Sequence, residues 1–526
     1  MHSFFHLIIS SQGAYVIGAL FVLWLIFSYQ SAPSKAGLCK LPGPRVARYS
    51  NFWRLRTSNS GFAPQKFREL HRKYGDVVRI GPNHVSISDP SLIPIIYGVS
   101  SKFIKSSFYE TLTPHIDGAP LDSIFSTKSQ SRHRSLKSGV AQKYSLSSLI
   151  RLEPLIDEVT QSFTRHIRRH ANESSSVDLG EWLQFYAFDV IGAITFSKTF
   201  GFSETGRDFN GVIEGLEFGL KYAAVVGQVP SFHKWLLGNT LLNKFASSIP
   251  ALRSKDPVQI VHGMIKDALR VADGSKGTTE SEDFLTFLKK QNKKDETKMS
   301  ERDMVNHMFV NLLAGSDTTA ISLRAIFYYL IKNPSCMARL LHEIQAADFA
   351  GLLSQTITYT ESLNHIPYLS LVIKESLRLH PAVPLNLERV VPEGGVNIHG
   401  HHLHAGTIVG MNAWVLHNDK EVFGTDAHEF RPDRWEETDD PNQRERLKIM
   451  ERSFFAFGHG SRTCIGKNIS LLEMSKFVPQ LLREFKLEWA ADEDWTIQST
   501  WFAKQSGFMA RIADRDYLKA HRNGDS

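Results

Sequence analysis

The chain has 526 residues, of which 42% are hydrophobic and 22% charged, as is typical of a globular protein with a large core. Its formal net charge of +7 is small for this length and is spread along the chain, which argues against a nucleic-acid-binding protein. The three cysteines, Cys39, Cys336 and Cys464, are too widely spaced for a disulfide framework or a zinc knuckle. Each thiol is therefore free for other chemistry.

The N-terminal segment is the first predicted element. No Asp, Glu, Lys or Arg occurs between Phe4 and Gln30, and the apolar run is long enough to span a bilayer. Basic residues follow the run, so the positive-inside rule places the rest of the chain in the cytosol. A cleaved signal peptide is the alternative, but such peptides begin with a basic region that is missing here. We expect a membrane anchor at residues 1–30, a basic Pro/Gly hinge at 31–60 and one folded domain at 61–526.

Helical patterns dominate this domain. The sequence "PQKFRELHRKYG" predicts an amphipathic helix that ends at Gly75, and the residues that follow predict a two-stranded hairpin. A second β-rich patch occurs around residues 394–414. No glycine-rich phosphate-binding motif is present, so no nucleotide site is expected. The fold class is therefore mainly α with a small β lobe.

A long apolar segment at residues 301–330 predicts a buried central helix. Ala314, Asp317 and Thr318 have i, i+3 and i+4 spacing, which places them on one helix face. Gly315 has no side chain, so another group can approach the backbone there. An acid beside a hydroxyl in an apolar wall suits proton delivery. The alternative is an Asp that is merely satisfied by local hydrogen bonds.

Three charged residues form a second candidate cluster. Glu375 and Arg378 have i, i+3 spacing on a predicted helix and can form an ion pair. Arg434, in "FRPDRW", could complete a triad with them. A buried triad would be structural, whereas most such pairs are solvated and contribute little.

The stretch "FFAFGHGSRTCIG" (Phe454–Gly466) holds Cys464 in a glycine-rich loop before a predicted helix. N–H groups at a helix start stabilise a thiolate. The glycines allow the backbone to approach something flat and large. Phe457 could pack on such a group, and Arg462 offers a positive charge to its acidic edge. A thiolate-ligated haem requires these features.

These motifs, in this order, resemble those of the cytochrome P450 family of haem-thiolate monooxygenases. The resemblance covers nearly the whole chain: an N-terminal apolar segment, a Pro-Gly hinge, "AGSDTT" in a long helix, an ExxR motif, "FRPDRW" and the cysteine loop. It implies the mainly helical cytochrome P450 fold, preceded here by an N-terminal transmembrane helix. Residues 61–526 would then be the haem-thiolate monooxygenase domain.

The resemblance also implies roles for single residues. Cys464 would be the axial thiolate of a haem b iron. Asp317 and Thr318 would relay protons to dioxygen, and Glu375, Arg378 and Arg434 would form the structural triad. The predicted haem-binding residues are His133, Lys137, Ala314, Gly315, Arg389, Phe457, Arg462, Cys464 and Gly466.

The chain departs from the family pattern at one of these positions. The family usually has Trp or His followed four residues later by Arg, whereas here His133 is followed by Lys137. Lysine keeps the charge but lacks the bidentate fork of arginine, and Arg132 or Arg134 could compensate. This stretch also resembles the pisatin demethylase-like branch of filamentous fungi.

The substrate site implied by the resemblance is largely apolar. Residues 106–126 match the variable substrate loop of the family. The other predicted pocket residues are Phe309, Leu313, Val383, Leu385, Asn386 and Leu387. Asn386 interrupts this apolar wall and could either bind a substrate oxygen or point away.

The resemblance implies a membrane-anchored monooxygenase of the endoplasmic reticulum with a cytosolic catalytic domain. It would take electrons from NADPH through NADPH–cytochrome P450 reductase, with cytochrome b5 as a further donor. It would insert one atom of O₂ into an apolar small molecule of fungal secondary metabolism. The expected reductase-binding face is basic and comprises Arg132, Arg134, Lys137, Lys143 and Lys467, with ordinary solvated charge as the alternative.

An alternative function is rearrangement or dehydration by a haem-thiolate enzyme without O₂. Asp317 and Thr318 argue against it, because that chemistry needs no proton relay to dioxygen.

Overall fold

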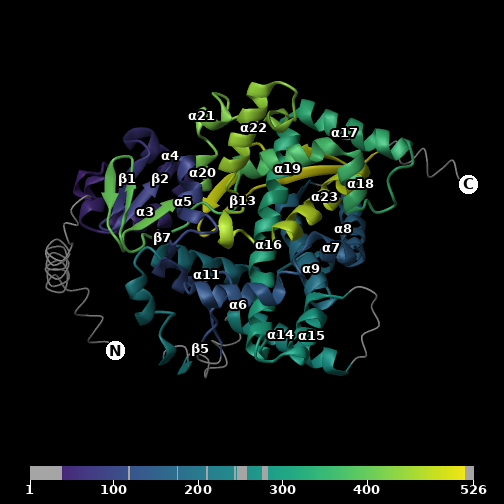
Figure 1. The fold of residues 1–526 in the computed structure, drawn as a ribbon. Coiled ribbons are helices and arrows are strands. Elements are labelled where there is room, and N and C mark those ends of the chain that lie inside the picture. The colour runs from purple at the N-terminus through teal and green to yellow at the C-terminus, as the bar shows by residue number, and fades with distance from the viewer. Residues whose placement is uncertain are drawn as a thin grey trace, which may run out of the picture.

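The computed structural model describes residues 38–515 except 117–118, 174–175, 209–210, 242–243, 246–256 and 275–281. It consists of a large helical body and a smaller β lobe, which lies at the left of Figure 1. The mainly helical fold class is therefore confirmed. The predicted anchor lies outside the described residues, and no helix within the described ranges is long and apolar enough to cross a bilayer.

The β lobe is built on a five-stranded sheet with the order β1 (Val77–Gly81), β2 (His84–Ile87), β10 (Ile408–Met411), β7 (Arg389–Val390) and β3 (Ile104–Lys105). The predicted hairpin forms β1 and β2, and the second β-rich patch supplies β10, which pairs with β2 in parallel. β7 joins this sheet beside β10 and pairs with β3 on its other side. The register of β3 and β7 sets Lys105 directly opposite Arg389.

The part of the predicted hinge that is described lies against the β lobe. It contains η1 (Leu38–Lys40), η2 (Arg45–Arg48) and α3 (Phe52–Asn59). The Arg79 backbone N–H of β1 donates to the Pro42 carbonyl at 2.8 Å, and its side chain donates to the Leu38 carbonyl at 3.3 Å. Residues 38–59 are thus attached to the lobe by both backbone and side-chain hydrogen bonds.

The helical body is organised around α16 (Glu301–Lys332), which runs through the middle of the molecule in Figure 1. Ser300 begins this helix by accepting a hydrogen bond from the Asp303 N–H at 3.1 Å, as an N-cap serine does. α16 packs along α9 (Leu179–Phe196), α19 (Pro367–Leu379) and α23 (Lys467–Glu484). Their apolar side chains form the main core.

The remaining elements cover this core or join it to the lobe. The other helices are α4 (Ala63–Tyr74), α5 (Ile93–Tyr97), α6 (Gln130–Val140), α7 (Leu146–Leu149), α8 (Glu153–Glu173), α10 (Phe202–Thr205), α11 (Val212–Val226), α14 (Pro257–Gly274), α15 (Phe284–Lys294), α17 (Pro334–Phe349), α18 (Tyr359–His365), α20 (Ala413–Leu416), α21 (Lys420–Phe423) and α22 (Pro441–Ser453). Short 3₁₀ helices are η3 (Pro90–Leu92), η4 (Ser107–Leu112), η5 (Ile150–Leu152), η7 (Pro230–Trp235), η8 (Pro432–Trp435) and η9 (Gly460–Arg462). The other strands pair as β11 (Phe485–Trp489) with β14 (Met509–Asp514) and β6 (Ser176–Asp178), β12 (Thr496–Ser499) with β13 (Ala503–Ser506), β4 (His115–Ile116) with β5 (Ala119–Pro120), and β8 (Val396–Ile398) with β9 (His401–Leu403).

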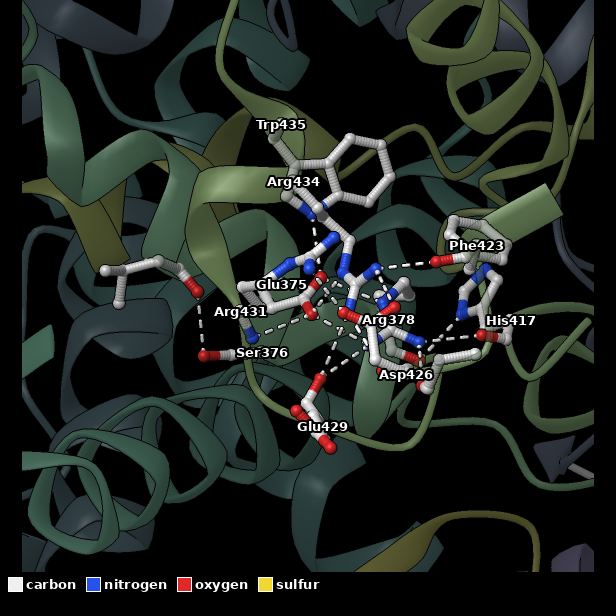
Figure 2. Close-up of polar contacts among 12 residues, drawn as sticks. Glu375, Ser376, Arg378, His417, Phe423, Asp426, Glu429, Arg431, Arg434 and Trp435 are labelled. Carbon is white, nitrogen blue, oxygen red and sulfur yellow. Dashed lines mark hydrogen bonds and ion pairs between the residues drawn. The ribbon is translucent and has the colours of Figure 1, made fainter. Parts of the chain in front are cut away.

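A buried carboxylate, Glu375, gathers the charged cluster anticipated from the sequence (Figure 2). One oxygen accepts from Arg378 Nη2 and Arg434 Nε, both at 2.8 Å, and from the Arg431 N–H at 3.1 Å. The other accepts from Arg378 Nε and from Trp435 Nε1, both at 2.8 Å. The Glu375 and Arg378 side chains are 0% exposed. The cluster therefore joins α19 to η8 inside the protein rather than at its surface.

His417 connects this cluster to the cysteine loop. Its Nε2 accepts the Phe455 backbone N–H at 2.7 Å, so its proton lies on Nδ1, which donates to the Arg378 carbonyl at 2.9 Å. Burial, together with the nearby Arg378 charge, lowers the pKa of His417 to about 3. The ring is thus neutral and holds the start of the loop against α19.

We expect Glu375→Ala to destabilise the fold by about 3–5 kcal/mol, because it leaves two buried guanidinium groups without their carboxylate. Urea unfolding followed by circular dichroism measures this change. Glu445→Ala is the matched control, since the pair of Glu445 with Lys448 is 58% and 62% exposed. It should alter the free energy of unfolding by about 0.5 kcal/mol or less. Similar losses in both variants would contradict a structural role for the Glu375 cluster.

A second prediction concerns the pH dependence of stability. The folded-state pKa of His417, about 3, lies below the usual 6.5, so the unfolded chain binds the proton first as the pH falls. The contribution of His417 is complete above about pH 6.5 and decreases by up to about 1.4 kcal/mol per pH unit below it. Unfolding free energies measured at about pH 7 and pH 5.5 should therefore differ more in the wild type than in His417→Gln. Equal differences would disprove the prediction.

Candidate active site

The cysteine loop is held in place by its own backbone and by a neighbouring tyrosine. The Cys464 N–H donates to the Phe457 carbonyl at 2.9 Å. Gly460 has φ +66°, and a Cβ there would lie 1.9 Å from the carbonyl oxygen of Tyr97. Only glycine fits so close to that carbonyl. The Tyr97 hydroxyl in turn donates to the Leu387 carbonyl at 2.7 Å, so this tyrosine joins the cysteine loop to the segment before β7.

Cys464 lies just before α23, as expected, and the backbone N–H groups of Gly466 and Lys467 bind its sulfur. Burial nevertheless raises the pKa of the Cys464 thiol above its usual value, although these N–H groups and the Lys467 charge lower it. The side chain is also accessible. Cys464 thus combines an accessible side chain with surroundings that disfavour its thiolate. Ala314 is likewise accessible, although it lies in the middle of the central helix α16.

A group of cations lies near this loop without carboxylate partners. Arg462 donates to the Thr127 carbonyl at 2.9 Å, and Arg389 donates to its neighbour's carbonyl, Glu388 O, at 2.8 Å. Lys105 donates to the carbonyl of Phe125. Among the described residues, none of the three cations forms an ion pair with a carboxylate, so no carboxylate of this part of the chain neutralises them by direct contact.

Lys105 is a member of this group that the sequence did not reveal. It is brought there by the pairing of β3 with β7, which sets it opposite Arg389. Burial lowers its pKa well below the usual value, and Arg389 and Arg462 lower it further. Its ammonium group also lies 4.0 Å from the ring centroid of Tyr109. No local motif marks Lys105, because its position depends on strand register.

The position at which the chain departs from the family pattern lies beside the same loop. Lys137 donates to the Ser461 carbonyl at 3.1 Å, next to Arg462. His133, one turn earlier on α6, is buried, and its pKa is lowered to about 4 by burial and by the charges of Arg462, Lys137 and Lys105. Arg132 instead pairs with Asp303. Arg134 is exposed. Lys137 is therefore the α6 cation that contacts the cysteine loop.

The central helix separates the two residues of the predicted acid–alcohol pair. Thr318 keeps accessible surface and donates to the Ala314 carbonyl at 2.8 Å. Asp317 is 5% exposed and accepts a hydrogen bond from Gln184 Nε2 of α9. The expectation of one shared face was therefore wrong for Asp317: it faces α9, while Ala314 and Thr318 face accessible space.

A buried network fixes the Asp317 carboxyl. Arg324 donates to Gln184 Oε1 and to the Gly180 carbonyl, both at 2.8 Å. Since a guanidinium only donates, Gln184 must turn its oxygen to Arg324 and its Nε2 to Asp317. Burial raises the pKa of Asp317, while Lys504 and the Gln184 hydrogen bond oppose this effect. Gln184 and Arg324 carry no local motif, and only the contact of α9 with α16 identifies them.

Close packing of a neighbouring helix explains why position 315 is a glycine. A Cβ there would lie 2.7 Å from Cδ1 of Ile191 on α9. The group that approaches this backbone is therefore a neighbouring helix. Gly315 allows the two helices to pack closely, which holds Gln184 near Asp317.

The predicted pocket residues do not form a single wall. Phe309 is 1% exposed and packs in the main core. Leu313 packs against the same core but keeps some accessible surface. Val383, Leu385 and Leu387 belong to a separate apolar cluster with Phe108 of η4 and Ile321 of α16. Asn386 is 7% exposed and, together with Leu385, lines a small hollow.

The predicted basic face requires a correction. Lys143 is 3% exposed and donates to the Glu282 carbonyl, so it cannot belong to a docking surface. Its ammonium also lies 5.5 Å from the Phe284 ring centroid. Arg134 and Lys467 are exposed. The basic docking face therefore contains fewer residues than the charge pattern predicted.

The residues present fit a haem group. The accessible Cys464 sulfur offers an iron ligand, and a bound cation would offset the burial that disfavours its thiolate. Arg389, Arg462 and Lys105 supply uncompensated positive charge that suits two propionate groups. The exposed Ala314 provides a surface without polar atoms. The chain thus has a ligand for the haem iron and cations for the haem propionates.

Comparison with known proteins agrees with this geometry. The family model described as Cytochrome P450 matches residues 42–511. The cytochrome P450 monooxygenase cicH of Emericella nidulans is 36% identical over 504 residues, which cover 95% of this chain and 99% of that protein. Pisatin demethylase of Fusarium vanettenii is 35% identical, covering 94% of this chain and 91% of the relative. The chain therefore belongs to the cytochrome P450 family and is a haem-thiolate monooxygenase.

Proposed function

We propose that this protein is a membrane-anchored monooxygenase that hydroxylates an apolar small molecule of fungal secondary metabolism. The observation that carries this proposal is an accessible Cys464 inside the protein, close to uncompensated cations. The balanced reaction consumes substrate, O₂, NADPH and one proton, and yields hydroxylated product, water and NADP⁺. One oxygen atom enters the product and the other enters water.

Cys464 is the proposed iron ligand, and Arg389, Arg462, His133 and Lys137 are the proposed propionate partners. Lys105 joins them on geometric grounds, because it lies opposite Arg389 in the sheet. Haem, when bound, supplies the iron at which dioxygen is activated. Phe457 packs against the main core and lies beside the cysteine, where it can cover one face of the ring. The protein then determines how the substrate is oriented and how it reaches the haem.

Asp317 and Thr318 are proposed to deliver the protons. Burial raises the pKa of the Asp317 carboxyl above its usual value, which favours proton uptake relative to an exposed aspartate. Gln184 donates to Oδ1 of Asp317, so Oδ2 is the proposed site of proton uptake. The Thr318 hydroxyl, which faces accessible space, donates to the Ala314 carbonyl and can turn to pass a proton onward. In this proposal Asp317 holds the proton and Thr318 passes it on.

Location at the endoplasmic reticulum membrane and electron supply by NADPH–cytochrome P450 reductase, with cytochrome b5 as a further donor, belong to the same proposal. Exposed aromatic side chains on the neighbouring elements α11 and η7 (Phe218, Phe232 and Trp235) support membrane contact, since exposed apolar surface is typical of membrane-interaction sites. Exposed Arg134 and Lys467 support an acidic electron donor.

Turnover under ¹⁸O₂ tests the reaction. The full-length protein in membranes with reductase and NADPH should convert members of a panel of apolar aromatic compounds to products that carry one ¹⁸O atom. Cys464→Ala should abolish labelled product and the red-shifted Soret band of the reduced carbon monoxide complex. Cys336→Ala is the matched control and should keep both. Products without label would favour rearrangement or dehydration, and an unchanged band in Cys464→Ala would reject the ligand assignment.

The proton-delivery proposal is tested by two isosteric variants of adjacent threonines. Thr318→Val should keep haem binding but raise the hydrogen peroxide released per NADPH consumed by roughly tenfold, since general acid catalysis contributes at least that much. Thr319 bonds to Ser470 of α23 at 3.1 Å instead. Thr319→Val should cost about 1 kcal/mol of stability without this uncoupling. Equal peroxide release in both variants would refute the role of Thr318.

A further inference from the structure

A narrow hollow lies between α3, α4, β1, η4 and residues 385–388, with room for about one water molecule. Its apolar wall comprises Phe67, Ile80, Phe108 and Leu385. Its polar lining comprises Arg54, Ser58, Gln228, Asn386 and Glu388. Phe108 and Leu385 share an apolar cluster with Ile321, one turn beyond Thr318 on α16. The apolar wall of the hollow therefore belongs to a cluster that reaches α16 beside Thr318.

The charges in this hollow already satisfy one another. Arg54 pairs with Glu388, and the two side chains are 2% and 9% exposed. Arg54 Nη1 also donates to the Gln228 carbonyl at 3.1 Å, while the second oxygen of Glu388 accepts the Ser106 hydroxyl at 2.5 Å. Because the pair is neutral overall, it does not favour a charged ligand. A carboxylate in the hollow would be repelled by Glu388 as much as it is attracted by Arg54.

Asn386 is the unsatisfied member of the lining. It is 7% exposed, and neither its Nδ2 nor its Oδ1 has a hydrogen-bond partner. A buried amide without partners is costly, so such groups normally meet a ligand or an ordered water. Gly410 of β10 lies against this side chain: a Cβ there would lie 2.8 Å from the Asn386 Cβ and 3.5 Å from its Nδ2. β10 therefore bounds the Asn386 amide on one side.

We propose that Asn386 is a specificity-determining residue that binds one uncharged hydroxyl oxygen. The hydroxyl accepts a hydrogen bond from Nδ2 and donates one to Oδ1. A water occupies this place in the resting protein, and a hydroxyl group of the substrate replaces it. This inference rests on the proposed function and narrows its substrate to an apolar molecule that already bears a hydroxyl group.

Binding of a matched probe pair to the haem-loaded, full-length protein tests this subsite. The probes are 2-naphthol and naphthalene, which differ by one hydroxyl group, and equilibrium dialysis gives both dissociation constants. The wild type should bind 2-naphthol about tenfold more tightly, the effect of one or two net hydrogen bonds. Asn386→Leu should reduce that preference to about one by weakening 2-naphthol binding. Asn397→Leu, at an exposed asparagine of β8, should keep the preference.

Two outcomes would overturn the proposal: a wild type without preference for 2-naphthol, including one that binds neither probe, and an Asn386→Leu variant that retains the preference. A crystal structure of the ligand-free protein separates the two sources of the hydroxyl. If a water lies at Asn386 and the wild type shows no preference for 2-naphthol, that water is structural only. This result would reject the role of Asn386 in substrate binding. Asn386→Leu should keep the Soret band of the carbon monoxide complex, so failure here is distinguishable from failure of the proposed function.

Discussion

The carboxylate of Glu375 is the interaction on which the rest of this structure depends. It is fully buried and binds five donors from α19, η8 and the residue before η8. A buried charge of this kind cannot lose a partner without a large loss of stability, so the arrangement forms as a unit. Arg378 then presents its backbone carbonyl to His417, which binds Phe455 at the start of the cysteine loop. The start of the loop is thus positioned from the interior, while its own backbone and Gly460 hold the rest of the loop.

Two polar regions with opposite properties lie around the proposed haem site. At the junction of the β lobe and the cysteine loop, Lys105, Arg389 and Arg462 concentrate positive charge that the described residues do not neutralise. On the other side of α16, Asp317 lies in a network with Gln184 and Arg324 that satisfies its hydrogen bonds. The first region suits an anionic ligand, and the second suits a proton that must be kept from solvent. The central helix keeps the two regions apart.

The sequence predicted those features that depend on local pattern. The central helix, the hairpin, the second β-rich patch and the helix after Cys464 all follow from periodicity, capping and glycine placement. Lys105, Tyr97 and Gln184 could not be found in this way, because strand register and helix packing bring them to the site. The same limit explains the errors at Asp317 and Lys143. Helical spacing alone cannot show that Asp317 turns to α9, and charge alone cannot show that Lys143 is buried.

The register of β3 and β7 has a thermodynamic consequence. Like charges directly opposite each other in an antiparallel pair oppose strand pairing, and here Lys105 faces Arg389 at the edge of the sheet. A dianion held by both cations would convert that repulsion into attraction. Cofactor loading and docking of the edge strand would then be linked equilibria, in which each favours the other. In the cofactor-free protein, the amide hydrogens of β3 should exchange faster with solvent than those of β2, and binding of the cofactor should slow them.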